Sequence, residues 1–562
     1  MMISRLLPAA LLTAVSSALA QQPQPLPLKM DPKKTTPAIT TADLMTRVYR
    51  FADDSMRGRM AGSPEAMKGT EYIAAEVKRL GLQPAGDSGT YFQNVPFGVQ
   101  TLDSASTIQI GETLLKAGVD FLASAPLGAA ARNQPIEVIF GGNAIDTTNM
   151  LSVDQVRGKF IVLLPPASQP TNVQALFASD GFRRYQEALS AAAMVGVVGG
   201  AQFSAPAVRN AFTPSTFVQL VPSEPPAVPP TVQLTQSAAD AILGAPNASV
   251  TKGAAGKTVQ PNVKFVLARR PGRNVVALLP GSDPKLKGQY VAIGAHSDHV
   301  GVRAQGAVEH DSMRVFNALV RPQGADSPPR PANSDEVARV RAMTDSLRAL
   351  HGARADSINN GADDDGSGSM GVLEIAEALA SAKQKPKRSI LFVWHMGEEE
   401  GMLGSRHFTD HPTVPRDSII AQLNVDMIGR GATADITGSG KGGEMLHGRD
   451  EGYLQLIGSR RLSTELGDLV EDVNKKQNAG FQFDYSLDAD GHPQNIYCRS
   501  DHYMYARYGI PIVFFTTGGH RDYHQVTDEP QYLNYDQFRR VTQLIHDVTW
   551  RVADLDHRPA VD

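Results

Sequence analysis

Residues 389–401 read SILFVWHMGEEEG, in which an almost entirely apolar run leads directly into consecutive glutamates. An apolar run of this length is typical of a strand that is buried on both faces of a sheet. Residues 368–383 have the apolar spacing of a helix, with Val372, Ile375 and Leu379 on one face. The alternation of strand, loop and helix predicts an α/β sheet with helices on both faces. Four other runs are predicted as strands of this sheet: 274–279, 290–296, 422–427 and 511–516.

Composition narrows the classes of protein that the chain can be. Its 562 residues carry a formal net charge of -4, which argues against a nucleic-acid binder, since such proteins normally have a basic excess. Cys498 is the single cysteine, so an internal disulfide and a zinc site built from several thiolates are both excluded. Any metal must therefore be held mainly by His, Asp and Glu.

The first 20 residues, MMISRLLPAALLTAVSSALA, predict a secretory signal peptide. Arg5 supplies the positive end, an apolar stretch follows, and Ala18-Leu19-Ala20 is a small-x-small cleavage site. No cysteine follows that would carry a lipid, and no later stretch is long and apolar enough for a transmembrane anchor. We therefore expect a secreted or periplasmic protein.

The rest of the chain divides by composition. Residues 21–40 are rich in Pro and Lys and predict an extended linker. Residues 101–265 predict a β-rich inserted domain with one helix near 181–194 and no chemistry of its own. The α/β domain is then discontinuous, covering 41–100 and 266–556, with helices predicted at 41–55 and 64–80. Within it, residues 303–360 are a polar insertion that contains a charged helix over 334–351.

Acidic residues and histidines cluster where the predicted strands end. In open α/β sheets, ligands bind at the carboxyl ends of the strands. Several carboxylates in one pocket repel one another unless cations neutralise them, and a pocket of oxygen and imidazole ligands suits Zn²⁺. Together these segments predict a metal site. The segments are AHSDH (295–299), GADDDGSG (361–368), GEEEGMLGS (397–405), NVDMIGR (424–430) and YHQVTD (523–528).

Other motifs are weaker. TGSGKGGE (437–444) matches a Gly-rich nucleotide motif literally, but without a preceding strand it favours a flexible loop. Asp501 and His502 lie just before the last predicted strand, where a structural and a substrate-side role are equally plausible. His299 and His520 are predicted to be pocket residues rather than metal ligands.

As an ordered set, the five segments resemble the M28 family of co-catalytic zinc peptidases, over residues 40–100 and 266–550. The resemblance implies the mixed central sheet of zinc exopeptidases (phosphorylase/hydrolase-like). VRGKFIVLL (156–164) and YQEALSAAAMVGVVGG (185–200) more weakly resemble the protease-associated (PA) domain that is often inserted in this family.

Matched motif by motif, the resemblance implies two zinc ions per chain that share the carboxylate of Asp364. It also implies Glu398 as the general base, Asp298 as the carboxylate that orients an imidazole, and Tyr523 as a donor to the oxyanion, with Glu400 at the rim. A cis peptide is implied between Asp364 and Asp365. The ligands implied are His296, Asp364 and Asp426 for one zinc ion, and Asp364, Glu399 and His524 for the other.

The function implied is a secreted dinuclear zinc exopeptidase acting on peptides. Its most favoured form is an aminopeptidase that hydrolyses N-terminal peptide bonds through a metal-bridging hydroxide and a glutamate base. Three alternatives stay open: a carboxypeptidase-type member that reads a carboxylate with Arg430, Arg499 or Arg507, a glutaminyl cyclase, and a catalytically silent binding protein. Side-chain preference and oligomeric state are not predicted. Residues expected near the ligands or in the substrate pocket are Asp365, Asp501, His502, Arg430 and Asp528.

Overall fold

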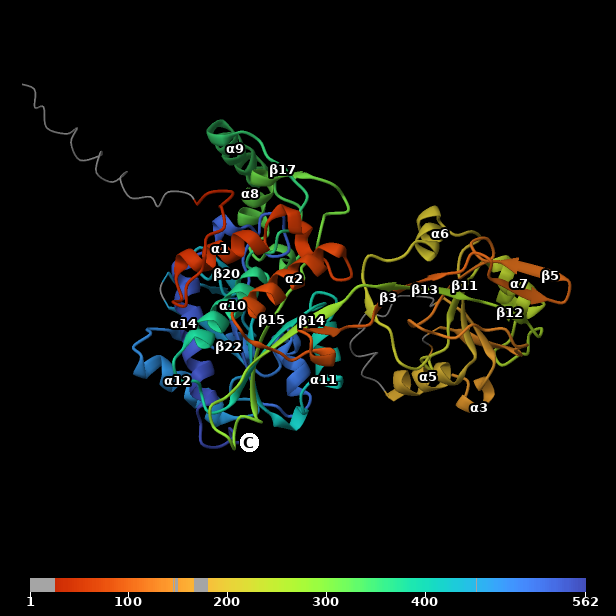
Figure 1. Ribbon diagram of the computed structural model, residues 1–562. Helices are drawn as coiled ribbons and strands as arrows, with labels where there is room; N and C mark the ends of the chain where they lie inside the picture. The colour runs from red at the N-terminus through yellow and green to blue at the C-terminus, as the bar shows by residue number, and fades with distance from the viewer. Residues whose placement is uncertain (1–25, 145, 147–149, 166–179, 451) are drawn as a thin grey trace, which may run out of the picture.

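The chain forms two lobes in the computed structural model, which describes residues 26–144, 146, 150–165, 180–450 and 452–562 (Figure 1). The lobes meet where β3 (Phe97–Leu102) pairs antiparallel with β13 (Phe265–Arg270). The predicted signal peptide lies outside the described residues.

A mixed sheet runs through the larger lobe, as predicted. Among the described residues its nine strands follow the order β1-β14-β18-β15-β19-β24-β22-β23, and β2 also pairs with β14. The strands β18, β15, β19 and β24 are parallel, whereas β14 is antiparallel to β18, and β22 to β24. The strand bounds are β1 (Gln83–Pro84), β2 (Phe92–Asn94), β14 (Arg273–Leu279), β15 (Tyr290–His296), β18 (Ser389–His395), β19 (Ile419–Val425), β22 (Tyr453–Ile457), β23 (Gln482–Asp484) and β24 (Ile512–Thr516).

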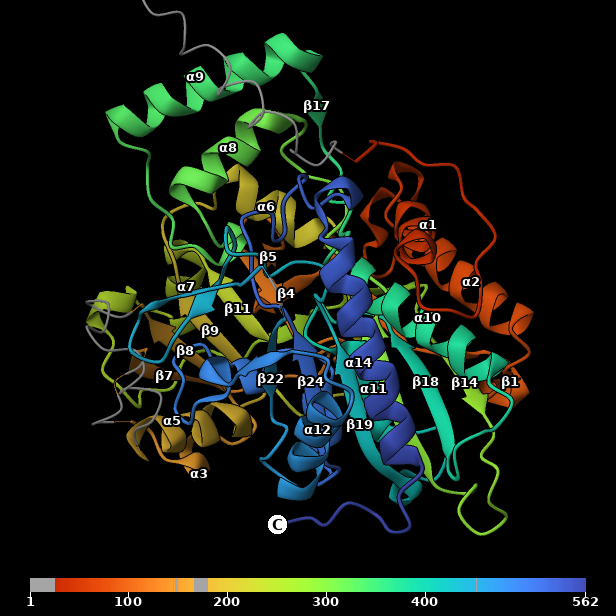
Figure 2. The same cartoon turned by 90° about the vertical axis from the view of Figure 1, so that its left-hand side faces the viewer.

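Helices cover both faces of this sheet, which confirms the predicted fold class. Alternate residues of β18 point to opposite faces, so Phe392 and Trp394 enter one core while Leu391 and Val393 enter the other. Figure 2 shows α10 and α14 side by side across the first face. The helices on that face are α1 (Thr41–Phe51), α2 (Pro64–Arg79), α10 (Gly366–Ser381), α12 (Thr464–Lys476) and α14 (Tyr535–Ala553). The opposite face carries α11 (Leu403–Asp410) and α13 (His502–Ala506).

The smaller lobe is rich in short strands, but the prediction of a single helix in it is wrong. Besides α5 (Asp180–Ala191) it holds α3 (Val153–Val156), α6 (Ala205–Phe212) and α7 (Gln236–Leu243). These helices are too short for apolar periodicity to reveal them, although capping residues Ser152, Ser204 and Thr235 mark their starts. Its described strands are β4 (Thr107–Ile110), β5 (Thr113–Lys116), β6 (Phe121–Ser124), β7 (Val138–Asn143), β8 (Phe160–Leu164), β9 (Met194–Val198), β10 (Gln219–Leu220), β11 (Thr231–Leu234) and β12 (Gln260–Asn262).

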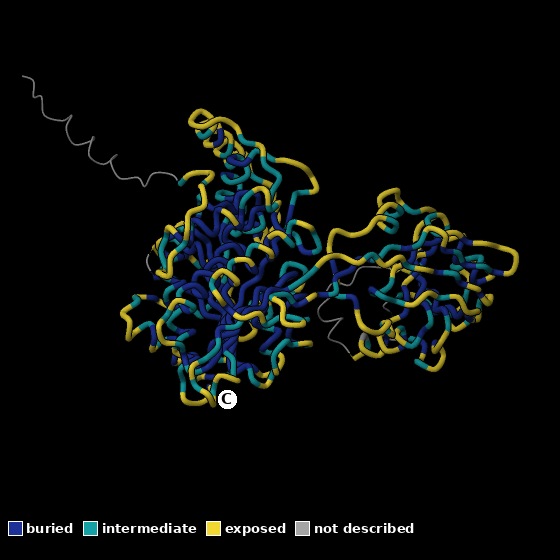
Figure 3. The backbone as a smooth tube through the Cα atoms, in the orientation of Figure 1, coloured by how far each residue is buried: buried dark blue, intermediate teal, exposed yellow. Residues whose placement is uncertain are grey.

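The polar insertion folds into two helices that stand above the larger lobe (Figures 1 and 2). The predicted charged helix is confirmed as α9 (Ser334–His351), but α8 (His310–Val320) was not predicted. The short strands β16 (Val308–Glu309) and β17 (Ala355–Asp356) pair at the base of the insertion. Most of α9 is exposed, in contrast to the buried interior of the lobe below it (Figure 3). Within the described part of the chain, no helix has the length and apolar character needed to span a membrane.

Candidate metal centre

The structure brings the predicted metal ligands and the predicted base, Glu398, together at the carboxyl ends of the parallel strands. Neighbouring parallel strands end at the same edge of the sheet, so residues that follow different strands meet there. The remaining ligand candidates come from the N-terminus of α10 and from the loop after β24. The residues concerned are His296 at the end of β15, Glu398 and Glu399 after β18, Asp426 after β19, Asp364 before α10, and His524 after β24.

Asp364 lies at the middle of this cluster and faces both halves of it. Its Oδ1 is 3.1 Å from Nε2 of His296, which is itself 3.7 Å from Oδ1 of Asp426. Its Oδ2 is 2.9 Å from Nε2 of His524, and that nitrogen is also 2.9 Å from Oε2 of Glu399. One carboxylate therefore presents one oxygen to each of two imidazole-carboxylate groups.

A further histidine belongs to this cluster. Nδ1 of His299 lies 2.8 Å from Oε1 of Glu399 and 3.7 Å from Oδ2 of Asp364. The donor atoms of His299, Asp364, Glu399 and His524 all lie within 4.8 Å of one another. We expected His299 to line the pocket without serving as a ligand, and the structure places it among the candidate ligands. His520, in contrast, points away to Asp363, with its Nε2 3.2 Å from that carboxylate.

The chemistry of the cluster fits divalent cations. Oδ2 of Asp364 and Nε2 of His524 are 2.9 Å apart but do not have the geometry of a hydrogen bond, and Nε2 of His299 is buried without a hydrogen-bond partner. Burial alone lowers the pKa of His296 and His524, but the carboxylates around them outweigh it and raise both values well above the usual range. The surroundings thus favour positive charge at these positions. Zinc, which prefers imidazole and carboxylate ligands, would supply it.

Asp298 supports the site in a different way from the one that we expected. Its backbone carbonyl is 3.1 Å from Nδ1 of His296, whereas its carboxylate is 3.8 Å from that nitrogen. Oδ1 of the carboxylate accepts backbone N–H groups from Gly397, at 2.7 Å, and from Glu398, at 3.3 Å. Burial raises the pKa of Asp298 to about 6. Asp298 therefore positions both the imidazole of His296 and the loop that carries Glu398.

Asp365 and Asp528 hold the segments around Asp364 in place by accepting backbone N–H groups. Oδ1 of Asp365 caps α10 by accepting the N–H of Gly368 at 2.8 Å, and its Oδ2 accepts the N–H of His296 at 3.1 Å. The Asp528 carboxylate accepts the N–H of Asp364 at 3.1 Å. The peptide between Asp364 and Asp365 is cis, as the family resemblance implied.

The other three predicted neighbours lie behind the pocket wall rather than along it. Arg430 is buried between Asp435 and Asp522, at 3.2 and 3.0 Å. Asp501 is buried 3.2 Å from Nδ1 of His395, and the ring of His502 stacks on Phe514. Their neighbour Ser500 does reach the site, donating to Oδ2 of Asp426 at 2.6 Å. In the sequence, Ser500 is distinguished only by its place before Asp501.

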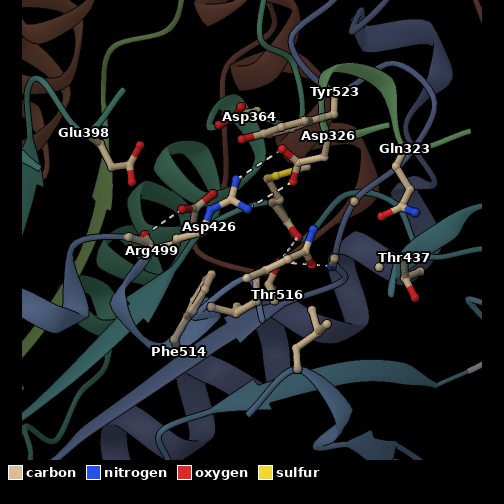
Figure 4. Close-up of a pocket in the computed structure, with 18 of the residues that line it drawn as sticks. Gln323, Asp326, Asp364, Glu398, Asp426, Thr437, Arg499, Phe514, Thr516 and Tyr523 are labelled. Atoms are coloured by element: carbon tan, nitrogen blue, oxygen red, sulfur yellow. Dashed lines mark hydrogen bonds and ion pairs between the residues drawn. The ribbon is translucent and has the colours of Figure 1, made fainter. Parts of the chain in front are cut away.

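A pocket with about 730 Å³ of space, part of it open to solvent, extends from the ligand cluster (Figure 4). Its inner end is acidic, with Glu398 and Asp426, and Tyr523 lies along one wall. The insertion contributes Gln323 and Asp326, which were not predicted as pocket residues. The Gly-rich stretch 437–444 is a hairpin between β20 (Ile436–Ser439) and β21 (Met445–His447), not a nucleotide loop. Besides the ligand candidates Asp364 and Glu399 and the polar residues Gln494, Arg499 and Ser500, the rest of the lining is apolar or small: Met427, Thr437, Gly438, Leu487, Ile496, Phe514, Thr516, Gly518 and Gly519.

An α/β lobe with one carboxylate set between two imidazole-bearing groups defines a candidate two-metal site. Residues 329–549 match the family model described as Peptidase family M28. The match includes the segments that contain Asp364, Glu398, Glu399, Asp426 and His524, while His296 precedes it.

Individual relatives share shorter stretches. A protein named "Probable leucine aminopeptidase" from Trichophyton verrucosum is 36% identical over 110 residues, which cover 19% of this chain and 30% of the relative. Leucine aminopeptidase 1 from Aspergillus fumigatus is 30% identical over 218 residues, covering 36% of this chain and 50% of the relative. The chain thus spans half or less of the length of these relatives. A solved zinc aminopeptidase from Bacillus subtilis aligns over 92% of this chain and 95% of its own, with 15% identity and a TM-score of 0.43.

Proposed function

We propose that the protein is a zinc aminopeptidase that binds two zinc ions and removes amino-terminal residues from peptides. The observation that carries the proposal is Asp364, whose two carboxylate oxygens face different imidazoles at 3.1 and 2.9 Å. His296 and Asp426 would complete one zinc site, and Glu399 and His524 the other. The relatives named as aminopeptidases support the same reaction class.

Zinc bound at these positions would supply Lewis acidity to the peptide carbonyl and lower the pKa of a water molecule. Glu398 is placed to take the proton of the attacking water, since it lines the pocket next to the ligand Glu399. Burial raises the pKa of Glu398 well above its usual value, which suits a group that must take up a proton and then pass it to the leaving amine. The Tyr523 side chain lines the same pocket and would donate a hydrogen bond to the developing oxyanion.

The charges in the pocket favour a free amino terminus over a carboxyl terminus. Besides the carboxylates assigned to zinc, its inner end presents the carboxylate of Glu398, which attracts an ammonium group and repels a carboxylate. Of the three arginines considered for a carboxypeptidase, only Arg499 lines the pocket, and Asp326 already binds its guanidinium at 3.2 and 3.4 Å. Arg430 is buried among acids, and Arg507 pairs with Asp410 outside the pocket.

The cyclase and the silent binding protein fit the site less well. A cyclase of this fold needs one zinc ion, whereas the two oxygens of Asp364 face two separate imidazoles, which favours two zinc ions. A silent protein has no need of Glu398 beside an intact ligand set. The predicted signal peptide supports export to the periplasm or the medium, so the proposed substrates are peptides found there.

The test is hydrolysis of a panel of aminoacyl reporters by the purified protein, beside the same reporters with an acetylated amino group. We expect zinc-dependent cleavage of the free-amine substrates alone and two zinc ions per chain by metal analysis. Equal cleavage of the acetylated reporters would contradict an aminopeptidase. A single bound zinc ion would contradict the shared carboxylate.

A further inference from the structure

Arg59 is a fully buried arginine in the segment between α1 and α2, and the proposed mechanism does not use it. Its relative exposure is 0%, and its guanidinium lies over the ring of Phe51, 4.3 Å from the centroid. Unlike most buried arginines, it is not engaged in an ion pair with any of the described residues. Its hydrogen bonds go to backbone carbonyl oxygens instead.

Three of these carbonyls belong to the two loops that carry candidate ligands. Nε of Arg59 donates to the carbonyl of Ser297 at 3.2 Å, in the loop between His296 and Asp298. Nη1 donates to Asn360 at 2.7 Å and Nη2 to Gly361 at 2.9 Å, in the segment that leads into Asp364. One planar cation thus ties together two loops that are about sixty residues apart in the sequence and are separated by the insertion.

Backbone hydrogen bonds next to Arg59 also hold this segment against the loop that follows His296. The N–H of His299 donates to the carbonyl of Arg59 at 3.3 Å, and the N–H of Gly301 donates to the carbonyl of Gly58 at 3.1 Å. Gly58 has φ +68°, and a Cβ there would lie 2.4 Å from the carbonyl oxygen of Asn359. The turn therefore fits against both loops so closely that only glycine can occupy it.

The positive charge of Arg59 lies near several carboxylates of the metal centre. Burial lowers its pKa only to about 10, so the side chain stays charged at neutral pH. The carboxylates that act on it through space are Asp298, Asp528, Asp364 and Asp365. A guanidinium that donates in several directions at once can hold several carbonyls, which a lysine ammonium cannot do with the same geometry.

We propose that Arg59 is a positioning residue of the metal centre, which fixes the relative placement of the His296 loop and the Asp364 loop and thereby sets the affinity for zinc. This inference rests on the proposed function only in requiring that zinc binds at these ligands. Groups that orient metal ligands commonly contribute about 10- to 100-fold to metal affinity when they are removed.

The test measures zinc affinity of the purified protein by competition with a chelator of known affinity, together with the unfolding temperature of the metal-free form. The variants are Arg59→Met and Arg59→Lys. The matched control is Arg47→Met, because Arg47 is also fully buried but binds Glu76, Glu374 and Glu377, away from the ligand loops. Arg59→Lys keeps the charge, so it covers the case in which Arg59→Met does not fold.

We expect both Arg59 variants to bind zinc more weakly, by about 10- to 100-fold for the variant to Met and less for the variant to Lys. Arg47→Met should lower the unfolding temperature of the metal-free protein and leave its zinc affinity unchanged. A folded Arg59 variant with wild-type zinc affinity would overturn the inference, and so would an equal loss of affinity in Arg47→Met. A wild-type protein that binds no zinc is a separate result, because it overturns the proposed function first.

Discussion

Glu398 and Glu400 have the same side chain two residues apart, but only Glu398 lines the pocket. We predict that Glu398→Gln lowers kcat by roughly 10² to 10⁴ and keeps both zinc ions, because the base is lost while every ligand remains. Glu400→Gln is the matched control and should retain most of the activity. The measurements are steady-state kinetics and metal content of the two variants. Full activity in Glu398→Gln would remove this residue from the mechanism.

His299 gives a second prediction at the level of single residues. Because its Nδ1 lies 2.8 Å from Oε1 of Glu399, it either orients this ligand or binds the metal itself. In both cases His299→Ala should weaken the binding of one zinc ion by about 10- to 100-fold. His411→Ala, which changes an exposed histidine outside the pocket, should have no effect on zinc binding. Chelator competition measures the zinc affinity of both variants. Wild-type affinity in His299→Ala would mean that the contact between His299 and Glu399 is incidental.

At this scale the sequence predicted residues with a recognisable motif and missed those that act through the backbone. His296, Asp364, Glu399, Asp426 and His524 stand at strand or helix ends in fixed motifs, and the structure brings them together. Arg59 was missed because it binds backbone carbonyls. Ser500 was missed because its partner, Asp426, is far away in the sequence. No pattern of residue types marks such contacts.

Among the elements, the strands with long apolar runs were predictable because burial on both faces leaves a continuous apolar signal. The run predicted as 422–427 corresponds to β19, whose start at Ile419 was missed because Gln422 lies inside the buried strand. The short strand β22 was missed as well, since five residues between polar loops resemble many other segments. Its antiparallel pairing with β24 depends on tertiary contacts that a single sequence does not display.

The turn between α8 and α9 provides a prediction for an element. The N–H of Ala325 donates to the carbonyl of Tyr523 at 3.0 Å, and Gly324 has φ +55°. A Cβ on Gly324 would lie 2.4 Å from the carbonyl oxygen of Tyr523, a backbone atom that cannot move away alone. Gly324→Ala should therefore displace Tyr523 and the adjacent His524, and lower kcat/KM on the order of 10²-fold.

Gly306 supplies the control for this variant, since it lies in the same insertion. It also has a positive φ, +86°, but a Cβ there meets nothing within 4 Å. Gly306→Ala should thus show the effect of backbone strain without the collision, with a small loss of stability and nearly normal kcat/KM. Equal activities of the two variants would show that the turn does not position Tyr523.

In the whole molecule, the junction of the two lobes packs against the loop after β18, which carries Glu398 and Glu399. Phe97, at the start of β3, is fully buried. Its ring lies so close to Gly397 that a Cβ on Gly397 would be 2.9 Å from the ring. The same cluster contains Met396 and Leu403, on either side of the two glutamates that serve the site. The smaller lobe is thereby anchored to the segment that carries Glu398, although none of its described residues lines the pocket.

A buried ion cluster joins the N-terminal part of the chain to the larger lobe. Arg47 of α1 binds Glu76 of α2 at 3.1 Å and Glu374 of α10 at 2.8 Å, and it also binds Glu377. Thr35, from the extended N-terminal segment, donates to Glu377 at 2.6 Å. Three carboxylates thus share one cation at the centre, with Arg79 as a partly exposed second partner for two of them. Burial outweighs the pairing with Arg47 and raises the pKa of Glu374 to about 7.

This raised value predicts how stability depends on pH. The pKa of a glutamate in the unfolded chain is about 4.3. Because the pKa of Glu374 is higher in the folded protein, protonated Glu374 stabilises the fold at pH values below about 4.3, and this stabilisation is lost as the pH rises towards 7. The shift corresponds to at most about 4 kcal/mol. The pKa of Glu76 is lowered, so its contribution is lost only at more acidic pH and does not change between pH 5 and pH 7.5.

The unfolding temperature of the metal-free protein should therefore fall by a few degrees between pH 5 and pH 7.5. Glu374→Gln should make that slope shallower, because a neutral amide at the same position does not titrate, while Asp298, whose pKa is raised to about 6, still does. Thermal unfolding of both proteins in chelator checks the prediction, and equal slopes would mean that Glu374 is ionised throughout this range.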